Sequence, residues 1–257
     1  MFPYIHIVLP TYGVMAFIGL FTAMLFLYFR KDRYGIEFGD FIKIFISGVI
    51  GLLIGSKVLY AVTQIPWLIH NFTVMNLLML IPQSGYVFYG GLLGTIAGVY
   101  IFIRKTNCGE SQKVYNMITP AIPLFHFFGR IGCYLSGCCY GKPLQAHFDF
   151  LGIIRFNRIP TQLFEALFEL MMFILCLIAG RKTNVYLLKL YLVCYSIFRF
   201  FIEFFRGDDE RGFLFVFSTS QWVSAIILIS IITSKVRQKR KGFPLTGSAA
   251  VRSMSAK

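Results

Sequence analysis

The sequence is dominated by long apolar runs that are separated by short polar segments. Runs such as Leu170–Ala179 and Trp222–Ile232 lack the alternation of apolar and polar residues that marks the strands of a membrane barrel. A helix of about 20 apolar residues can cross a bilayer, and it satisfies its own backbone hydrogen bonds there. The pattern therefore predicts an all-α, polytopic membrane helix bundle. About seven transmembrane helices are expected, at 12–29, 42–63, 86–103, 118–135, 162–179, 186–205 and 219–234.

Composition supports this fold class. The chain is 57% hydrophobic and 14% charged, with a mean hydropathy of +0.69, whereas soluble domains are usually about a quarter charged. A formal net charge of +14 could suggest a nucleic-acid partner. However, the lysines and arginines gather in the loops, as is typical of an inner-membrane protein, so we expect no nucleic-acid partner.

The basic residues are unevenly divided between alternate loops. They are frequent in the first, third and fifth predicted loops and in the tail, whereas residues 64–85 contain none. Because cytoplasmic loops carry the excess of lysine and arginine, the N-terminus is predicted outside and the C-terminus in the cytoplasm. Residues 1–235 are expected to form a single seven-helix domain. Residues 236–257 are expected to form a basic, disordered cytoplasmic tail against anionic lipid.

Charged residues inside the predicted spans mark candidate chemistry, because burying a charge in a membrane is costly. Arg130 lies near the outer end of the fourth span, and Arg199, Glu203 and Arg206 follow one another at the end of the sixth. Arg199 and Glu203 are four residues apart, so they share a helix face and can pair. A guanidinium offers two parallel donors to a phosphate. These arginines therefore predict a site for the anionic head of a lipid, with a structural ion pair as the alternative.

Other motifs admit two interpretations. Glycines such as Gly90 and Gly91 allow helices to pack closely in lipid, but a double glycine at the start of a span also allows a ligand to approach the backbone. Pro160 and Thr161 form a sound helix start. Gln162 and Glu165 then face the same way, either as site residues or as part of a cap and hydrogen-bond cluster.

Three of the six cysteines follow Arg130 closely: Cys133, Cys138 and Cys139. Their spacing lacks the second pair and the histidine pattern of a zinc site, so we expect no metal and no cofactor. A metal site that includes His126 or His147 is an alternative. A disulfide with another outer thiol, a reactive thiolate near Arg130 and inert buried thiols remain open.

Together these motifs resemble those of the prolipoprotein diacylglyceryl transferase family, in order, in spacing and over most of the chain. The matching segments are Tyr12–Met15, Gly55–Lys57, Phe88–Gly94, Gly129–Gly132 with Gly141, Pro160–Glu165 and Arg199–Arg206. The resemblance implies a multi-pass enzyme of the bacterial cytoplasmic (inner) membrane. Such an enzyme transfers the diacylglyceryl group of phosphatidylglycerol to the cysteine thiol in the lipobox of a prolipoprotein signal peptide and releases glycerol phosphate. Its partners are therefore phosphatidylglycerol, the lipobox and membrane lipid.

The resemblance also implies roles for individual residues. Arg130 and Arg199 correspond to the essential pair, and Tyr12 and Tyr89 are the further candidate catalytic residues. The candidate substrate-binding residues are Gly90, Gly91, Gly132, Gly141, Gln162, Glu165, Glu203 and Arg206.

Three positions depart from the family pattern. Tyr89 stands where a histidine is usual, Cys133 where an asparagine is usual and Cys138 where a glutamate is usual. A tyrosine, with an ordinary pKa of about 10, is a poorer base at neutral pH. The alternatives are therefore a non-catalytic phospholipid-binding membrane protein, a related transferase with another acceptor, and an enzyme that uses Cys133 or Cys138 as a covalent relay or redox-gated element.

Overall fold

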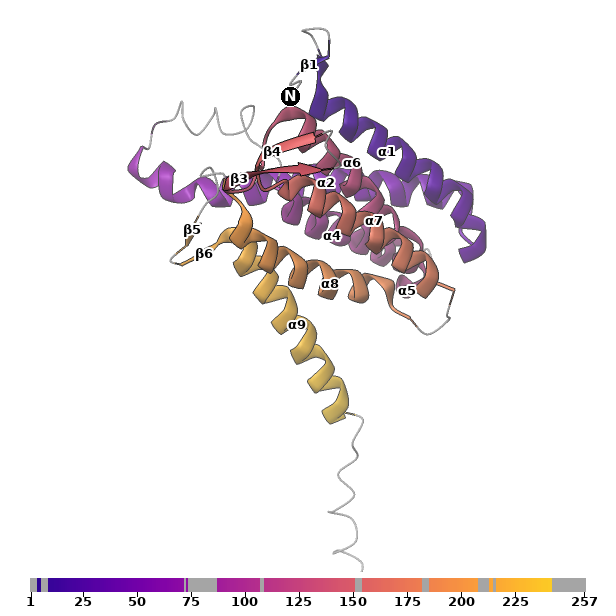
Figure 1. Ribbon diagram of the computed structural model, residues 1–257. Helices are drawn as coiled ribbons and strands as arrows, with labels where there is room; N and C mark the ends of the chain where they lie inside the picture. The colour runs from indigo at the N-terminus through magenta and orange to yellow at the C-terminus, as the bar shows by residue number, and fades with distance from the viewer. Residues whose placement is uncertain are drawn as a thin grey trace, which may run out of the picture.

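The protein is a bundle of helices with short β-hairpins between them (Figure 1). The computed structural model describes residues 4–5, 9–71, 73, 87–106, 109–150, 154–181, 185–207, 213–214 and 216–241. The helices are α1 (Thr11–Arg30), η1 (Lys31–Tyr34), α2 (Phe38–His70), α4 (Phe88–Thr106), α5 (Ser111–Ile118), α6 (Ala121–Ser136), α7 (Thr161–Ala179), α8 (Leu187–Ile202), η2 (Glu203–Phe205) and α9 (Thr219–Lys241). The strands are β1 (Tyr4–Ile5), β2 (Leu9–Pro10), β3 (Pro143–Phe150), β4 (Ile154–Arg158), β5 (Phe213–Leu214) and β6 (Phe217–Ser218).

A helix occupies each of the seven segments that the apolar pattern predicts. By length and hydropathy, three of the described helical stretches are able to cross a membrane: Thr11–Tyr34, Phe38–Ile65 and Thr161–Ala179. Helices α6 and α8 have 16 residues each, which corresponds to about 24 Å of helix against about 30 Å of hydrocarbon. Helix α9 continues to Lys241, beyond the predicted domain boundary at residue 235. Residues 242–257 of the predicted tail lie outside the described part of the chain.

Glycines bring α2 and α4 into direct backbone contact. A Cβ atom added at Gly94 would lie 2.0 Å from the carbonyl oxygen of Gly51, and one added at Gly90 would lie 2.3 Å from that of Gly55. No real Cβ atom fits at such distances, so these positions require glycine. Small residues permit this close approach of helices in lipid. The helix-packing interpretation of the glycine pattern is therefore confirmed for this pair.

Apolar side chains cover both the interior and the outer surface of the bundle. Tyr191, Tyr195 and Phe41 are among the largest fully buried side chains, whereas Phe17 on α1 and Phe29 at its end are 70% and 77% exposed. Further exposed apolar side chains lie along α2, α7 and α9. A soluble monomer rarely exposes so many large apolar groups, so these faces are suited to contact with lipid.

The hairpins gather at one end of the bundle, and α5 lies at the other (Figure 1). The antiparallel pair β3–β4 connects the end of α6 to the start of α7, and β5–β6 connects α8–η2 to α9. An isolated bridge joins Gly141 to Arg206 between these two connections. The polar ends of α6, α7 and α8 therefore meet in one region.

Candidate active site

Two arginines from different helices lie on either side of one carboxylate. Arg130 on α6 places Nη2 2.5 Å from Oε2 of Glu165 on α7. Arg199 on α8 places Nη1 3.7 Å from Oε1 of the same residue. All three side chains are buried. The sequence placed these residues in separate motifs, and the structure brings them together.

Arg199 is also held from its C-terminal side. Its Nη2 lies 2.8 Å from Oε2 of Glu203, which confirms the pairing predicted from the four-residue spacing. The same nitrogen donates to Oγ of Ser220 at 3.3 Å. Among the described residues, Nη1 of Arg199 has no hydrogen-bond acceptor, and neither oxygen of Glu165 accepts an aligned hydrogen bond. The cluster therefore holds a buried donor whose hydrogen-bonding capacity is unused.

A chain of hydrogen bonds fixes Arg130 from the opposite side. Nε of Arg130 donates to Nε2 of His126 at 3.1 Å, and Nδ1 of His126 lies 2.8 Å from Oε1 of Glu169. An arginine nitrogen only donates, so Nε2 of His126 accepts and Nδ1 carries the proton that is shared with Glu169. The hydroxyl of Tyr191 donates to Oε2 of Glu169 at 3.1 Å. This chain orients the guanidinium toward Glu165.

The start of α7 holds the turn that follows α6. Helix α6 ends at Ser136 and is capped by Gly137, whose left-handed backbone (φ 78°) returns hydrogen bonds to the last turn. The side chain of Gln162 donates to the carbonyl oxygen of Cys138 at 2.7 Å. The hydroxyl of Thr161 donates to the carbonyl oxygen of Cys139 at 3.0 Å. Gln162 is therefore a support for the cysteine turn, and the hydrogen-bond-cluster interpretation of the 160–165 motif is confirmed for it.

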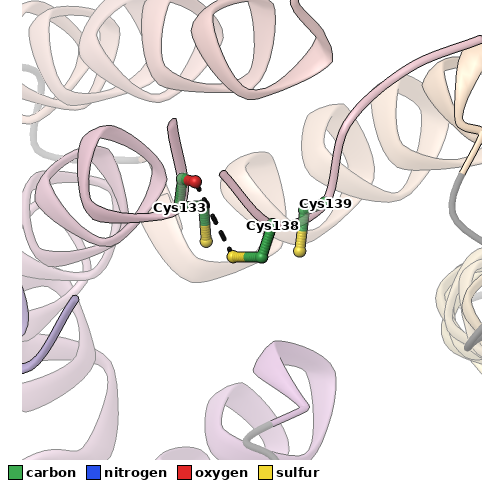
Figure 2. Close-up of side chains that lie close together, drawn as sticks. All are labelled: Cys133, Cys138 and Cys139. Atoms are coloured by element: carbon green, nitrogen blue, oxygen red, sulfur yellow. Dashed lines mark hydrogen bonds between the residues drawn. The ribbon is translucent and has the colours of Figure 1, made fainter. Parts of the chain in front are cut away.

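The three cysteines converge in this turn. Their sulfur atoms all lie within 4.8 Å of one another, on the same side of the chain (Figure 2). Hydrogen bonds with the Cys133 and Cys138 thiols lower the pKa of Cys139 well below the usual thiol value, against the effect of burial. For Cys138, the bond with Cys133 lowers the pKa, but the bond with Cys139 and burial outweigh it and raise that pKa to about 11.

Two of the predicted substrate-binding glycines have packing roles. A Cβ atom at Gly132 would lie 3.0 Å from Cβ of Met15 and 3.3 Å from Cδ2 of Tyr12, so Gly132 lets α1 approach α6. Tyr12 therefore lies beside α6 at Gly132, which is two residues from Arg130 along the chain. A Cβ at Gly141 would lie 2.4 Å from the carbonyl oxygen of Ile159. Direct contact of these glycines with substrate stays a prediction.

Tyr89 lies on the inner face of α4, where its hydroxyl and the Oγ atom of Ser224 on α9 are 2.6 Å apart. Its ring packs edge-on against Tyr195. The hydroxyl is thus engaged in the contact between α4 and α9. The neighbouring Gly90 packs against α2, and a Cβ atom at Gly91 would touch Leu52 at 3.4 Å. A catalytic role for Tyr89, and substrate contacts for Gly90 and Gly91, stay predictions.

Sequence reasoning did not assign His126 and Glu169 to the site. The signal was present as two matched spacings, since His126 and Arg130 are four apart on α6, and Glu165 and Glu169 are four apart on α7. Pairs at this spacing share one face of a helix. In the structure these two faces pack together, so that Arg130 contacts Glu165 and His126 contacts Glu169. Only the packing of α6 against α7 reveals this match.

The fold and the site define a membrane protein with a buried cluster of arginines and carboxylates at one end of a helical bundle. The family described as prolipoprotein diacylglyceryl transferase matches residues 1–236. The chain therefore belongs to this family.

Curated relatives support this assignment over nearly their whole length. A phosphatidylglycerol–prolipoprotein diacylglyceryl transferase of Clostridium tetani is 31% identical over 242 residues, which cover 90% of this chain and 94% of the relative. A second, from Clostridium perfringens, is 33% identical over 248 residues, covering 92% and 94%. A third, from Idiomarina loihiensis, is 32% identical over 243 residues, covering 90% and 88%.

Proposed function

We propose that this chain transfers the diacylglyceryl group of phosphatidylglycerol to the lipobox cysteine of a prolipoprotein and releases glycerol phosphate. Family membership gives the reaction class. The observation that carries the proposal is the buried pair Arg130 and Arg199 around Glu165, with a donor on Arg199 that no described residue accepts.

The chemistry requires such a pair. The acceptor thiolate attacks a glyceryl carbon, the bond from that carbon to the phosphate oxygen breaks, and the electron pair leaves with glycerol phosphate. The phosphate gains negative charge as it departs, since a diester with about one charge becomes a monoester with about 1.5 to 2 charges. Donors that are already in place stabilise this change most strongly. Arg130 and Arg199 are the catalytic residues in this proposal.

The carboxylates act as positioning residues. Glu165 and Glu203 hold Arg199, and the His126–Glu169 pair holds Arg130. A phosphate oxygen would take the unused Nη1 donor of Arg199 and would displace part of its contact with Glu165. An unmet buried donor costs about 1–3 kcal/mol, so this exchange favours an anionic ligand.

The bundle also contains an apolar cavity of about 90 Å³. It is lined by residues of α1, α2, α4, α5 and α6, including Leu20, Leu52 and Phe88. The ring of Phe88 also stacks on His126, with ring centroids 3.4 Å apart. One aromatic ring thus separates an apolar cavity from the residue that holds Arg130. In the proposed complex, an acyl chain enters this cavity while the phosphate lies at the arginines.

The proposed setting is the bacterial cytoplasmic membrane, crossed seven times by one domain over residues 1–235, with the N-terminus outside and the C-terminus inside. The positive-inside distribution of basic residues supports this orientation. It puts the β3–β4 end of the bundle, and with it the arginine cluster, at the outer face. The lipobox of a translocated prolipoprotein reaches the membrane from that side.

The test uses purified protein in mixed micelles with labelled phosphatidylglycerol and a lipobox peptide. Mass spectrometry should find a diacylglyceryl adduct on the peptide cysteine, together with released glycerol phosphate. A peptide with serine in place of that cysteine should give neither product. Lipid turnover without a peptide adduct would point to another acceptor. The absence of both products, where a curated relative is active, would leave the lipid-binding alternative.

A further inference from the structure

The turn between α6 and β3 places three cysteine sulfurs where one ion can contact all of them. Cys133 belongs to the last turn of α6, and Cys138 and Cys139 follow the left-handed Gly137. The backbone N–H of Cys138 returns to the carbonyl oxygen of Cys133 at 3.1 Å, which closes the turn. Cys139 has a positive φ of 57°, a conformation that non-glycine residues seldom adopt.

We propose that Cys133, Cys138 and Cys139 bind one zinc ion, and that its fourth position receives the acceptor thiol of the lipobox peptide. The sulfurs lie within 4.8 Å of one another. Three thiolates at the zinc–sulfur distance of about 2.3 Å are separated by about 3.8 Å in a tetrahedral site. The sulfurs therefore need to close by no more than about 1 Å.

The site has the composition of a catalytic rather than a structural zinc centre. Structural sites usually have four protein ligands, whereas catalytic sites have three and an open position. The metal-ligating group found among the described residues consists of these three cysteines. Cys133 is buried and Cys138 is exposed, so the cluster can be reached from outside at Cys138.

The surroundings favour a centre with net negative charge. Three thiolates and Zn²⁺ together carry one negative charge, and the charges of Arg206 and Arg130 both act on Cys139. The turn is also held rigidly from α7 by Gln162 and Thr161. Ligands that are fixed by hydrogen bonds around them bind a metal more tightly.

This inference rests on the proposed function and supplies a step that it needs. An acceptor thiol that coordinates a metal loses its proton outright, and here the proton passes to solvent. The coordinated sulfur attacks the glyceryl carbon, and the bond to the phosphate oxygen breaks toward Arg130 and Arg199. The new thioether is a weaker ligand than a thiolate and dissociates. A cysteine of the cluster that took the glyceryl group itself would remain a stable thioether, so the cluster does not act as a relay.

The metal itself provides the first test, independent of turnover. Protein purified under reducing conditions should contain about one zinc ion per chain, as a three-thiolate site requires. Replacement by Co²⁺ should give sulfur-to-cobalt charge-transfer absorption and the d–d bands of a tetrahedral site. Cys133→Ser, Cys138→Ser and Cys139→Ser should each lose the ion. Cys194→Ala, which removes a half-buried thiol on α8, is the matched control and should keep it.

Adding the lipobox peptide to the cobalt form should shift these bands as a fourth sulfur binds, and the serine peptide should not shift them. Zinc content no higher than in Cys133→Ser, or a disulfide within the cluster of the reduced protein, would overturn the inference. Metal-free protein that still forms the peptide thioether would reject the zinc site alone. A zinc-loaded protein that binds the peptide but releases no glycerol phosphate would reject the proposed function alone.

Discussion

Replacing Arg130 by alanine removes the cation that links α6 to α7. The variant loses the 2.5 Å contact with Glu165 and the 3.1 Å hydrogen bond to His126. Glu165 then keeps Arg199, at 3.7 Å, as its described cationic partner. The substitution therefore affects both the leaving phosphate and the buried carboxylate.

The two effects have different magnitudes. Loss of one positioned donor to a developing anion lowers kcat by about 10²–10³-fold, or about 2.7–4 kcal/mol. Removing one partner of a buried ion pair costs about 3–5 kcal/mol of folding stability. The loss should be smaller here, because Arg199 still lies close to Glu165. Arg130→Lys keeps the charge but lacks the planar fork that reaches both His126 and Glu165. We expect it to fall between alanine and the unchanged protein.

The assay is the initial rate of glycerol phosphate release from labelled phosphatidylglycerol in the presence of a lipobox peptide. Thermal unfolding in detergent shows whether each variant is folded. Arg104→Ala is the control, because Arg104 is exposed on α4 and donates only to Tyr100 among the described residues. A folded Arg130→Ala protein whose rate stays within about threefold of the unchanged protein would refute a role for Arg130 in the transition state.

Three further outcomes are expected. Glu169→Gln should lower turnover about tenfold, or about 1.4 kcal/mol, without unfolding the protein, because it weakens the hydrogen bond to His126. An unchanged rate would argue against a positioning role for the chain from Glu169 through His126 to Arg130. Tyr89→Phe should change turnover less than about threefold, whereas a general base would contribute about 10²-fold or more. Gly94→Leu should destabilise the bundle by about 2–3 kcal/mol through overpacking, measured by thermal unfolding. The control Gly48→Ala should have little effect, because its Cβ has room at 3.5 Å.

The helices could be predicted from the sequence because a lipid environment requires long runs of apolar residues. Long apolar runs located every predicted span, and the structure places a helix at each. The ends were less certain: α2 extends to His70, well beyond the predicted limit at residue 63. Hydropathy marks only the apolar part of a helix, and α2 continues beyond that part, through Pro66.

The site was only partly readable. The Arg199–Glu203 pair follows from spacing within one helix, and it is present. The shared carboxylate of Glu165 depends on how α6, α7 and α8 pack, which no spacing along the chain contains. The cysteine cluster shows the same limit, since its sulfurs meet only because Gly137 and Cys139 both adopt positive φ values.

The most direct test of the proposed function is the ratio of its two products. Phosphatidylglycerol is labelled separately in the diacylglyceryl glycerol and in the phosphate, and both labels are followed with a lipobox peptide present. The proposed reaction forms one peptide thioether for each glycerol phosphate released, and both products fall together in Arg130→Ala. Glycerol phosphate released without an equal amount of thioether would contradict transfer to the lipobox cysteine.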